Sequence, residues 1–272
     1  MTKNLDGEGL RSVFDNYELL FIDLWGVVHN GIELHENAIY TLSKISEAKK
    51  DYILLTNAPR PNKTVKIFLE KLGLDKSMRE KVFTSGEAAL GYLKKNYISQ
   101  KFYHIGPPRD FNLFIDFKNE KTEDLDKSNY LLCTGLYDQH DQDLNFYKEL
   151  LINSISKKMI CTNPDLIVDR GKEREYCAGS VAMTFEKLGG EVIYFGKPYP
   201  EVYNQATNGN KKKVIAIGDN LRTDIKGANN MNYDSLVITG GIHKKEFEKE
   251  GIEKVLKNYN VKATFSQSIL KW

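Results

Sequence analysis

Isolated carboxylates follow two apolar runs of this 272-residue chain, where they are well placed for chemistry. Asp23 directly follows one apolar run, and Asp219 follows another after a single glycine. Thr56 ends a third apolar run, and Lys197 stands in a Gly-Lys-Pro turn. Because the carboxyl ends of parallel strands meet at one crevice, we expect these residues to lie together. Carboxylates, a hydroxyl and a lysine gathered in this way are typical of phosphoryl transfer.

Each carboxylate and the lysine has a predicted role. Asp23 would attack phosphorus and form an aspartyl-phosphate, which water then hydrolyses. Phosphate oxygens repel a carboxylate, so Mg²⁺ is expected, bound by Asp23, Asp219 and the backbone carbonyl of Trp25. Asp224 would orient the water bound to the metal, and Lys197 would offset negative charge on Asp23 and the phosphoryl group. Turn formation is the alternative role for Asp219 and Asp224, and a surface position is the alternative for Lys197.

The segment Thr56-Asn57-Ala58 precedes a predicted helix. Backbone amides at the start of a helix bind anions. We therefore expect the Thr56 hydroxyl, with Asn57 and Ala58, to donate hydrogen bonds to phosphate oxygens.

The elements that must position these residues alternate along the chain. Apolar runs predict strands at 19–22, 52–55, 82–84, 103–106, 130–133, 159–162, 214–217 and 236–239, with helical spacing near 39–45, 65–72, 85–93 and 144–155. This alternation indicates an α/β fold with a parallel, Rossmann-like sheet. We predict a core of residues 1–87 and 191–272, with 88–190 forming an inserted α/β domain.

Composition excludes several classes of protein. A net charge of +2 gives no strong attraction to nucleic acid or membrane, and no apolar stretch approaches the ~20 residues of a membrane span. Three scattered cysteines and a polar N-terminus indicate a reduced, cytoplasmic protein without a signal peptide. The charged runs 172–175 and 211–213 are interpreted as solvated surface.

In order and spacing, the motifs resemble those of the haloacid dehalogenase superfamily, class IIA, the group of NagD-type nucleotide phosphatases and 4-nitrophenylphosphatases. The four motifs span 23–31, 55–58, 196–198 and 217–225, so the resemblance covers nearly the whole chain. It implies Mg²⁺, a Rossmann-like core and a cap domain that closes over a small phosphorylated metabolite. It also implies a homodimer formed through the cap. Cap-type sequence makes Asn163, Asp165 and Gly179 candidates for contact with the substrate, with turn formation as the alternative.

Trp25 departs from the family pattern, in which a second Asp stands two residues after the nucleophile. That Asp protonates the leaving oxygen, which is typically worth ~10²–10⁴ in rate, and an indole cannot replace it. Trp25 leaves three alternatives. In the first, the protein is an enzyme that is weak or restricted to good leaving groups. In the second, His29 takes over the proton transfer, and in the third, the protein binds a phosphorylated ligand without turning it over. A loop histidine without catalytic function is the alternative for His29.

Overall fold

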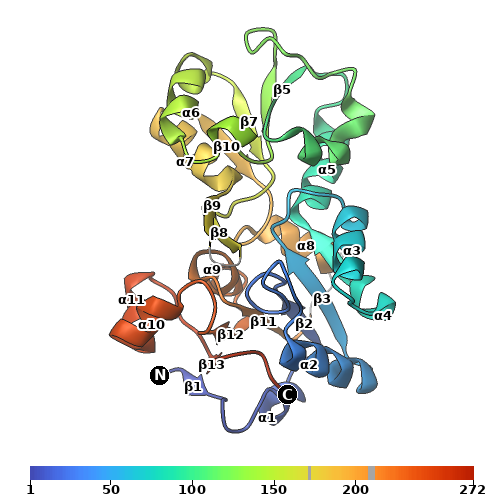
Figure 1. Ribbon diagram of the computed structural model, residues 1–272, viewed down its shortest axis with the longest axis vertical. Helices are drawn as coiled ribbons and strands as arrows, with labels where there is room; N and C mark the ends of the chain where they lie inside the picture. The colour runs from blue at the N-terminus through green and yellow to red at the C-terminus, as the bar shows by residue number, and fades with distance from the viewer. Residues whose placement is uncertain (171–172, 208–211) are drawn as a thin grey trace. The chain divides into compact units, whose positions relative to one another are not determined.

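The computed structural model describes residues 1–170, 173–207 and 212–272 (Figure 1). Its strands form two sheets of seven and four members and a two-stranded hairpin, so the predicted α/β fold is confirmed. The chain divides into two compact units. The first comprises Met1–Thr56, Lys66–Phe83 and Lys197–Trp272, and the second comprises Asn57–Val65 and Thr84–Gly196. Lys172 and Lys211, in the two charged runs, lie outside the described residues.

The first unit is built on the seven-stranded sheet. In spatial order its strands are β1 (Lys3–Asn4), β13 (Phe265–Gln267), β12 (Asp234–Ile238), β11 (Val214–Gly218), β2 (Leu19–Ile22), β3 (Asp51–Thr56) and β4 (Val82–Thr84). The strands from β1 to β3 pair in parallel. Every residue of β2 and β11 is buried, as expected for apolar strands covered on both faces.

Helices connect these strands, and one of them, α3, begins in the second unit and ends in the first. They are α1 (Arg11–Phe14), α2 (Glu36–Glu47), α3 (Asn62–Lys71), α4 (Lys76–Arg79), α8 (Pro200–Thr207), η4 (Leu221–Ile225), α9 (Lys226–Asn230), α10 (Lys244–Glu250) and α11 (Ile252–Asn258). In α2, the buried residues Ala38, Leu42 and Ile45 recur at helical spacing, which explains the apolar pattern of this segment. Among the described residues, no helix is long and apolar enough to span a bilayer.

The second unit contains the four-stranded parallel sheet, in the order β10 (Glu191–Tyr194), β7 (Lys158–Cys161), β6 (Tyr130–Cys133) and β5 (Phe102–Ile105). Its other elements are α5 (Ser85–Asn96), η1 (Pro108–Phe117), η2 (Asp138–His140), α6 (Leu144–Leu151), η3 (Ile152–Ser154), the hairpin β8 (Ile167–Arg170) and β9 (Glu173–Tyr176), and α7 (Ala178–Lys187). The predicted core range included β10, but β10 pairs with β7 and lies in this unit. The predicted domain ranges stay a prediction.

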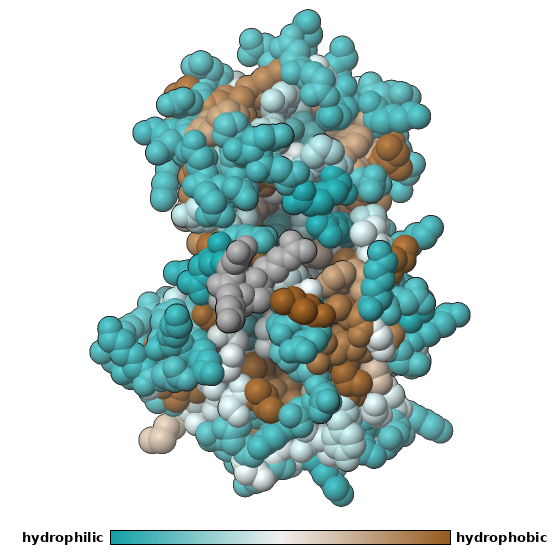
Figure 2. All heavy atoms as spheres, in the orientation of Figure 1, coloured by the Kyte–Doolittle hydropathy of each residue, from teal (hydrophilic) through white to brown (hydrophobic). Residues whose placement is uncertain are grey.

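The surface and the buried thiols agree with the composition. Figure 2 shows a largely hydrophilic face with scattered hydrophobic residues. Cys133, Cys161 and Cys177 are free and buried, and burial raises the pKa of the Cys133 thiol to about 12. The cysteines therefore pack as apolar side chains.

Candidate active site

The first unit brings three carboxylates together at the carboxyl ends of adjacent strands. Asp23 follows β2, and its N–H donates to the carbonyl of Ile217 in β11 at 2.9 Å. Asp219 comes directly after β11, and Asp224 lies in η4. Carboxylate oxygens of the three residues lie within 4.8 Å of one another, and all three residues are buried. The predicted convergence of Asp23, Asp219 and Asp224 is therefore present in the structure.

Lys197 bridges two of these carboxylates. Its Nζ lies 2.5 Å from Asp23 Oδ1 and 2.6 Å from Asp224 Oδ1, and its side chain is only 5% exposed. Burial by itself would lower the pKa of Lys197, but the charges of Asp224 and Asp23 outweigh that effect and raise it. Burial, followed by the charge of Asp224, raises the pKa of Asp23 well above its ordinary value.

One lysine cannot balance three carboxylates in a buried site. Three carboxylates gathered within 4.8 Å repel one another when ionised, and burying this much negative charge is costly unless positive charge lies beside it. Hard carboxylate oxygens at this spacing suit a divalent cation such as Mg²⁺, which prefers oxygen ligands. The donor set of Asp23, Asp219 and Asp224 thus fits the predicted metal.

A wide helical turn places Asp224. In η4, the N–H groups of Asp224 and Ile225 both donate to the carbonyl of Asn220, at 2.9 and 3.3 Å. The N–H of Asn220 in turn donates to Asp224 Oδ2 at 3.1 Å. A Cβ atom on Gly218 would overlap the Asp224 carboxylate, so only glycine allows this close approach. Such π-type turns occur frequently at functional sites.

Two further glycines enclose the carboxylate of Asp219. A Cβ atom on either Gly26 or Gly241 would overlap Asp219 Oδ2. The N–H of Ile242 donates to the same oxygen at 2.8 Å. Gly241 and Ile242 were not predicted as site residues, because nothing in the sequence near them indicates that they contact Asp219.

The predicted phosphate-binding segment begins at the same edge of the sheet. Thr56 is buried and ends β3, the neighbour of β2. Asn57 and Ala58 belong to the second unit, where the carbonyl of Ala58 accepts from Ser85 Oγ at 3.0 Å and from the N–H of Gly86 at 3.2 Å. The contacts of Thr56, Asn57 and Ala58 with phosphate stay predictions.

Comparison with known proteins identifies the family. A model described as haloacid dehalogenase-like hydrolase matches residues 20–116, and a second, HAD-hydrolase-like, matches 194–261. A crystal structure of a haloacid dehalogenase-like hydrolase from Brucella suis 1330 is 30% identical, with a TM-score of 0.83, covering 97% of this chain and 99% of that one. The chain belongs to the haloacid dehalogenase-like hydrolase family. The predicted place in class IIA, among the NagD-type phosphatase-like hydrolases, is confirmed.

Two curated members of this family match over most of their length. Phosphoglycolate phosphatase 2 of Arabidopsis thaliana is 24% identical, covering 88% of each chain. An acid sugar phosphatase of Staphylococcus saprophyticus is also 24% identical, covering 87% of this chain and 92% of the relative. Both names describe enzymes that act on phosphorylated small molecules.

Within this haloacid dehalogenase-like site, the indole of Trp25 packs on its own loop. A Cβ atom on Gly31 would overlap the six-membered ring of the indole. The ring also meets His29 edge to face, with centroids 5.0 Å apart. Gly31 adopts φ +87, a conformation that favours glycine. The indole can therefore pack at this position only because residue 31 has no side chain. The indole is thus a structural group of the loop.

His29 is buried beside Trp25 and has the properties of a packed, neutral imidazole. Its Nδ1 accepts from the N–H of Gly31 at 3.0 Å, and Phe68 packs edge-on at 5.6 Å. Burial, followed by the charge of His35, lowers the pKa of His29 to about 4. An imidazole with this pKa is almost entirely neutral near pH 7, so the structure favours the alternative of a loop histidine without catalytic function.

The candidate cap residues form a turn that has a structural explanation. The N–H of Asp165 donates to Asn163 Oδ1 at 3.0 Å, which is an Asx turn, and the N–H of Gly179 donates to the carbonyl of Asp165 at 3.1 Å. A Cβ atom on Gly179 would overlap the carbonyl oxygen of Pro164. Turn formation accounts for Asn163, Asp165 and Gly179, and their contact with substrate stays a prediction.

Proposed function

We propose that this chain is a Mg²⁺-dependent phosphatase that acts on a small phosphorylated metabolite through an aspartyl-phosphate intermediate. The observation that supports this proposal is the buried cluster of Asp23, Asp219 and Asp224, in which Lys197 contacts both Asp23 and Asp224. Three buried carboxylates repel one another, which is costly in a purely structural cluster, whereas a phosphoryl-transfer site needs such a cluster to hold a cation. The names of the two curated relatives support a small phosphate ester as the substrate.

The chemistry assigns each residue a step. Bound Mg²⁺ would neutralise the phosphoryl oxygens. Lys197 holds Asp23 at Oδ1, and Oδ2, which has no hydrogen-bond partner among the described residues, attacks phosphorus. The bond from phosphorus to the leaving oxygen breaks, and that oxygen departs with its electron pair. Water then attacks phosphorus, loses a proton to solvent and releases inorganic phosphate and the Asp23 carboxylate. Thr56 and the amides that follow it would hold the phosphoryl oxygens.

Trp25 restricts the leaving group. The indole cannot protonate the departing oxygen, and burial keeps His29 neutral and engaged with Gly31. A lost general acid costs ~10²–10⁴ in rate for alkoxide leaving groups but little for those that are stable as anions. We therefore infer that acyl phosphates and aryl phosphates are the preferred substrates.

Turnover of activated phosphates tests this proposal. Phosphate release from acetyl phosphate and 4-nitrophenyl phosphate is measured with Mg²⁺ and with a chelator. We expect activity that requires the metal and is abolished by Asp23→Asn. Asp15→Asn, at an exposed position, is the matched control and should keep full activity. Absence of turnover on every activated phosphate would contradict the proposal and favour a silent phospho-ligand-binding protein.

Restoring the missing acid tests the role of Trp25 separately. Trp25→Asp should raise activity toward glycerol phosphate, a poor leaving group, on the order of 10²-fold or more. Trp25→Phe, which removes the indole without adding a carboxyl, should not. Equal activities of the two variants would show that the leaving group is limited by something other than a missing acid.

We propose a homodimer formed through the cap, and a ligand that is a small metabolite and not a nucleic acid. Sedimentation of the purified chain would test the first.

A further inference from the structure

The loop after β12 holds one side of the Asp219 carboxylate. The N–H of Ile242 donates to Asp219 Oδ2 at 2.8 Å, and a Cβ atom on Gly241 would overlap the same oxygen. Both residues directly precede His243, the N-cap of α10, so contacts that fix His243 also fix this donor. Because outer contacts orient the ligands of a metal, the anchoring of this loop bears on the affinity of the site.

The side chain of His243 ties the loop to Glu246. His243 is buried, and its Nδ1 lies 2.8 Å from Glu246 Oε1. Burial by itself would raise the pKa of Glu246, but hydrogen bonds from His243 and Tyr259 outweigh that effect and lower it. Glu246 is therefore ionised near pH 7. Because a carboxylate has no proton to donate, Nδ1 of His243 carries the hydrogen, and the bond is charge-assisted.

Tyr259 holds Glu246 from the other end and extends the contacts to η4. Its hydroxyl lies 3.1 and 2.9 Å from the two carboxylate oxygens of Glu246. Its ring meets the imidazole of His243 edge to face, with centroids 4.8 Å apart. The guanidinium carbon of Arg222, in η4, also lies 4.8 Å from the centroid of this ring, which is a cation–π contact.

Through Arg222 the contacts reach a second carboxylate of the cluster. The N–H of Arg222 donates to Asn220 Oδ1 at 2.9 Å, and the N–H of Asn220 donates to Asp224 Oδ2 at 3.1 Å. A continuous set of contacts within the first unit therefore joins Asp219 to Asp224. Such contacts matter because ionised carboxylates within 4.8 Å of one another repel, so their spacing must be fixed from outside the cluster.

We propose that His243, Glu246 and Tyr259 are positioning residues that hold Asp219 in the geometry for binding Mg²⁺. This inference rests on the proposed function, of which the metal is a part. The three residues act through the backbone of Ile242 and are not themselves ligands. If they only anchored the start of α10, their loss would affect stability and leave the affinity for Mg²⁺ unchanged, so the two explanations give different results.

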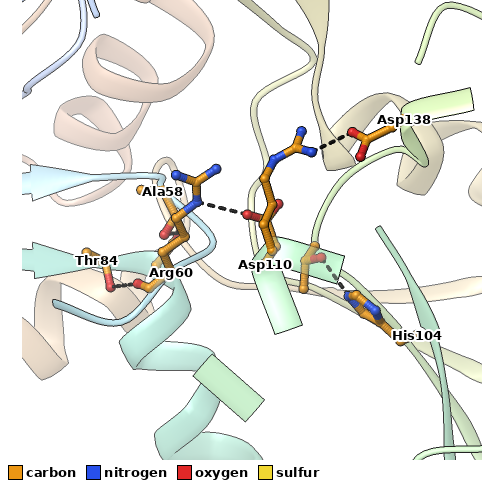
Figure 3. A network of polar contacts seen from close by, with 9 residues as sticks. Ala58, Arg60, Thr84, His104, Asp110 and Asp138 are labelled. Carbon is orange, nitrogen blue, oxygen red and sulfur yellow. Dashed lines mark hydrogen bonds and ion pairs between the residues drawn. The ribbon is translucent and has the colours of Figure 1, made fainter. Parts of the chain in front are cut away.

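Isothermal titration of the chain with MgCl₂ measures this affinity without substrate. Glu246→Ala removes the acceptor of His243 from a side chain that is 46% exposed, so the fold should tolerate the change. We expect the Kd for Mg²⁺ to rise on the order of tenfold, the lower end of what outer contacts contribute to metal affinity. Asp138→Ala is the matched control. Asp138 is 53% exposed and pairs with Arg109 in the second unit (Figure 3), so its loss should leave the Kd unchanged.

A pair of changes at His243 separates its hydrogen bond from its packing. His243→Leu fills the space but cannot donate to Glu246, so the Kd should rise as it does in Glu246→Ala. His243→Asn keeps an N–H near the position of Nδ1 and should retain most of the affinity. Combining His243→Leu with Glu246→Ala should weaken binding no further than either change alone, because both remove the same bond.

Two results would overturn the inference while the proposed function stands. The first is that Glu246→Ala binds Mg²⁺ as tightly as Asp138→Ala does. The second is that His243→Leu and His243→Asn lose affinity equally. Absence of Mg²⁺ binding by the unaltered chain would overturn the inference together with the metal-dependent function. Because the titration contains no substrate, its outcome is separate from the turnover assays on activated phosphates.

Discussion

Removing the charge of Lys197 tests whether the buried cluster is a coupled unit. Lys197→Met keeps a long side chain but leaves Asp23 and Asp224 without the cation that lies 2.5 and 2.6 Å from them. Both carboxylates are buried, so water cannot replace the lost ion pair. Breaking a buried pair from one side typically costs about 3–5 kcal/mol, because the remaining charge is uncompensated.

This loss is large enough to measure by thermal unfolding. For 272 residues, 3–5 kcal/mol corresponds to a fall in Tm of about 5–9 °C. We expect Asp224→Asn to recover part of the loss when it is added to Lys197→Met, since it removes one of the two unpaired charges. Added Mg²⁺ should also stabilise Lys197→Met more than the unaltered chain, because the metal replaces the missing positive charge.

A surface lysine provides the matched control for this prediction. Lys212 pairs with Asp51 at 2.6 Å, but both side chains have substantial exposure. Lys212→Met should therefore cost no more than about 1 kcal/mol. If Lys197→Met lowers Tm no further than Lys212→Met does, the electrostatic argument for the cluster is wrong.

Two further perturbations address the metal site and the pH dependence. Gly241→Ala places a methyl group against Asp219, so we expect the affinity for Mg²⁺ to fall on the order of tenfold, as measured by thermal unfolding at increasing Mg²⁺ concentration. Gly7→Ala is the control, because nothing lies within 4 Å of the added methyl group, and it should leave the affinity unchanged. Equal affinities in the two variants would refute this reasoning. Burial lowers the pKa of His104 from 6.5 to about 4. As the pH falls below about 6.5, His104 is therefore protonated in the unfolded chain but stays neutral in the folded chain until the pH approaches 4. The free energy of unfolding should therefore fall by about 2 kcal/mol between pH 7 and pH 5 through this residue, and urea unfolding of His104→Gln should show a smaller decrease; an identical decrease would exclude His104 as the cause.

Local sequence patterns predicted the elements that position the carboxylates. The run Leu19–Ile22 forms β2 over the same residues, and Val214–Gly218 extends the predicted strand by one residue. Strands buried on both faces leave a strong apolar signal, and the polar residue that ends each one is equally visible. Parallel pairing then brought Asp23 and Asp219 to one edge, so topology supplied what local pattern could not.

Other features depend on contacts between distant segments and left weaker signals. The short strands β1 and β13 pair with each other across almost the whole chain, and neither has a long apolar run. The polar stretch after Pro107 was not assigned to an element but forms η1, which carries Asp110. The closure of Gly241 over Asp219 was likewise invisible, because nothing local to β12 indicates which carboxylate lies above it.

The proposed mechanism limits the leaving group of the substrate. The site has groups that handle charge, namely the carboxylate cluster and Lys197, but Trp25 and the neutral His29 supply no acid. If Asp23 is the nucleophile, as we propose, the leaving oxygen departs as an anion, and acyl and aryl phosphates should react faster than alkyl phosphates. The ratio of turnover on acetyl phosphate to turnover on glycerol phosphate measures this restriction, and equal rates on the two would contradict it.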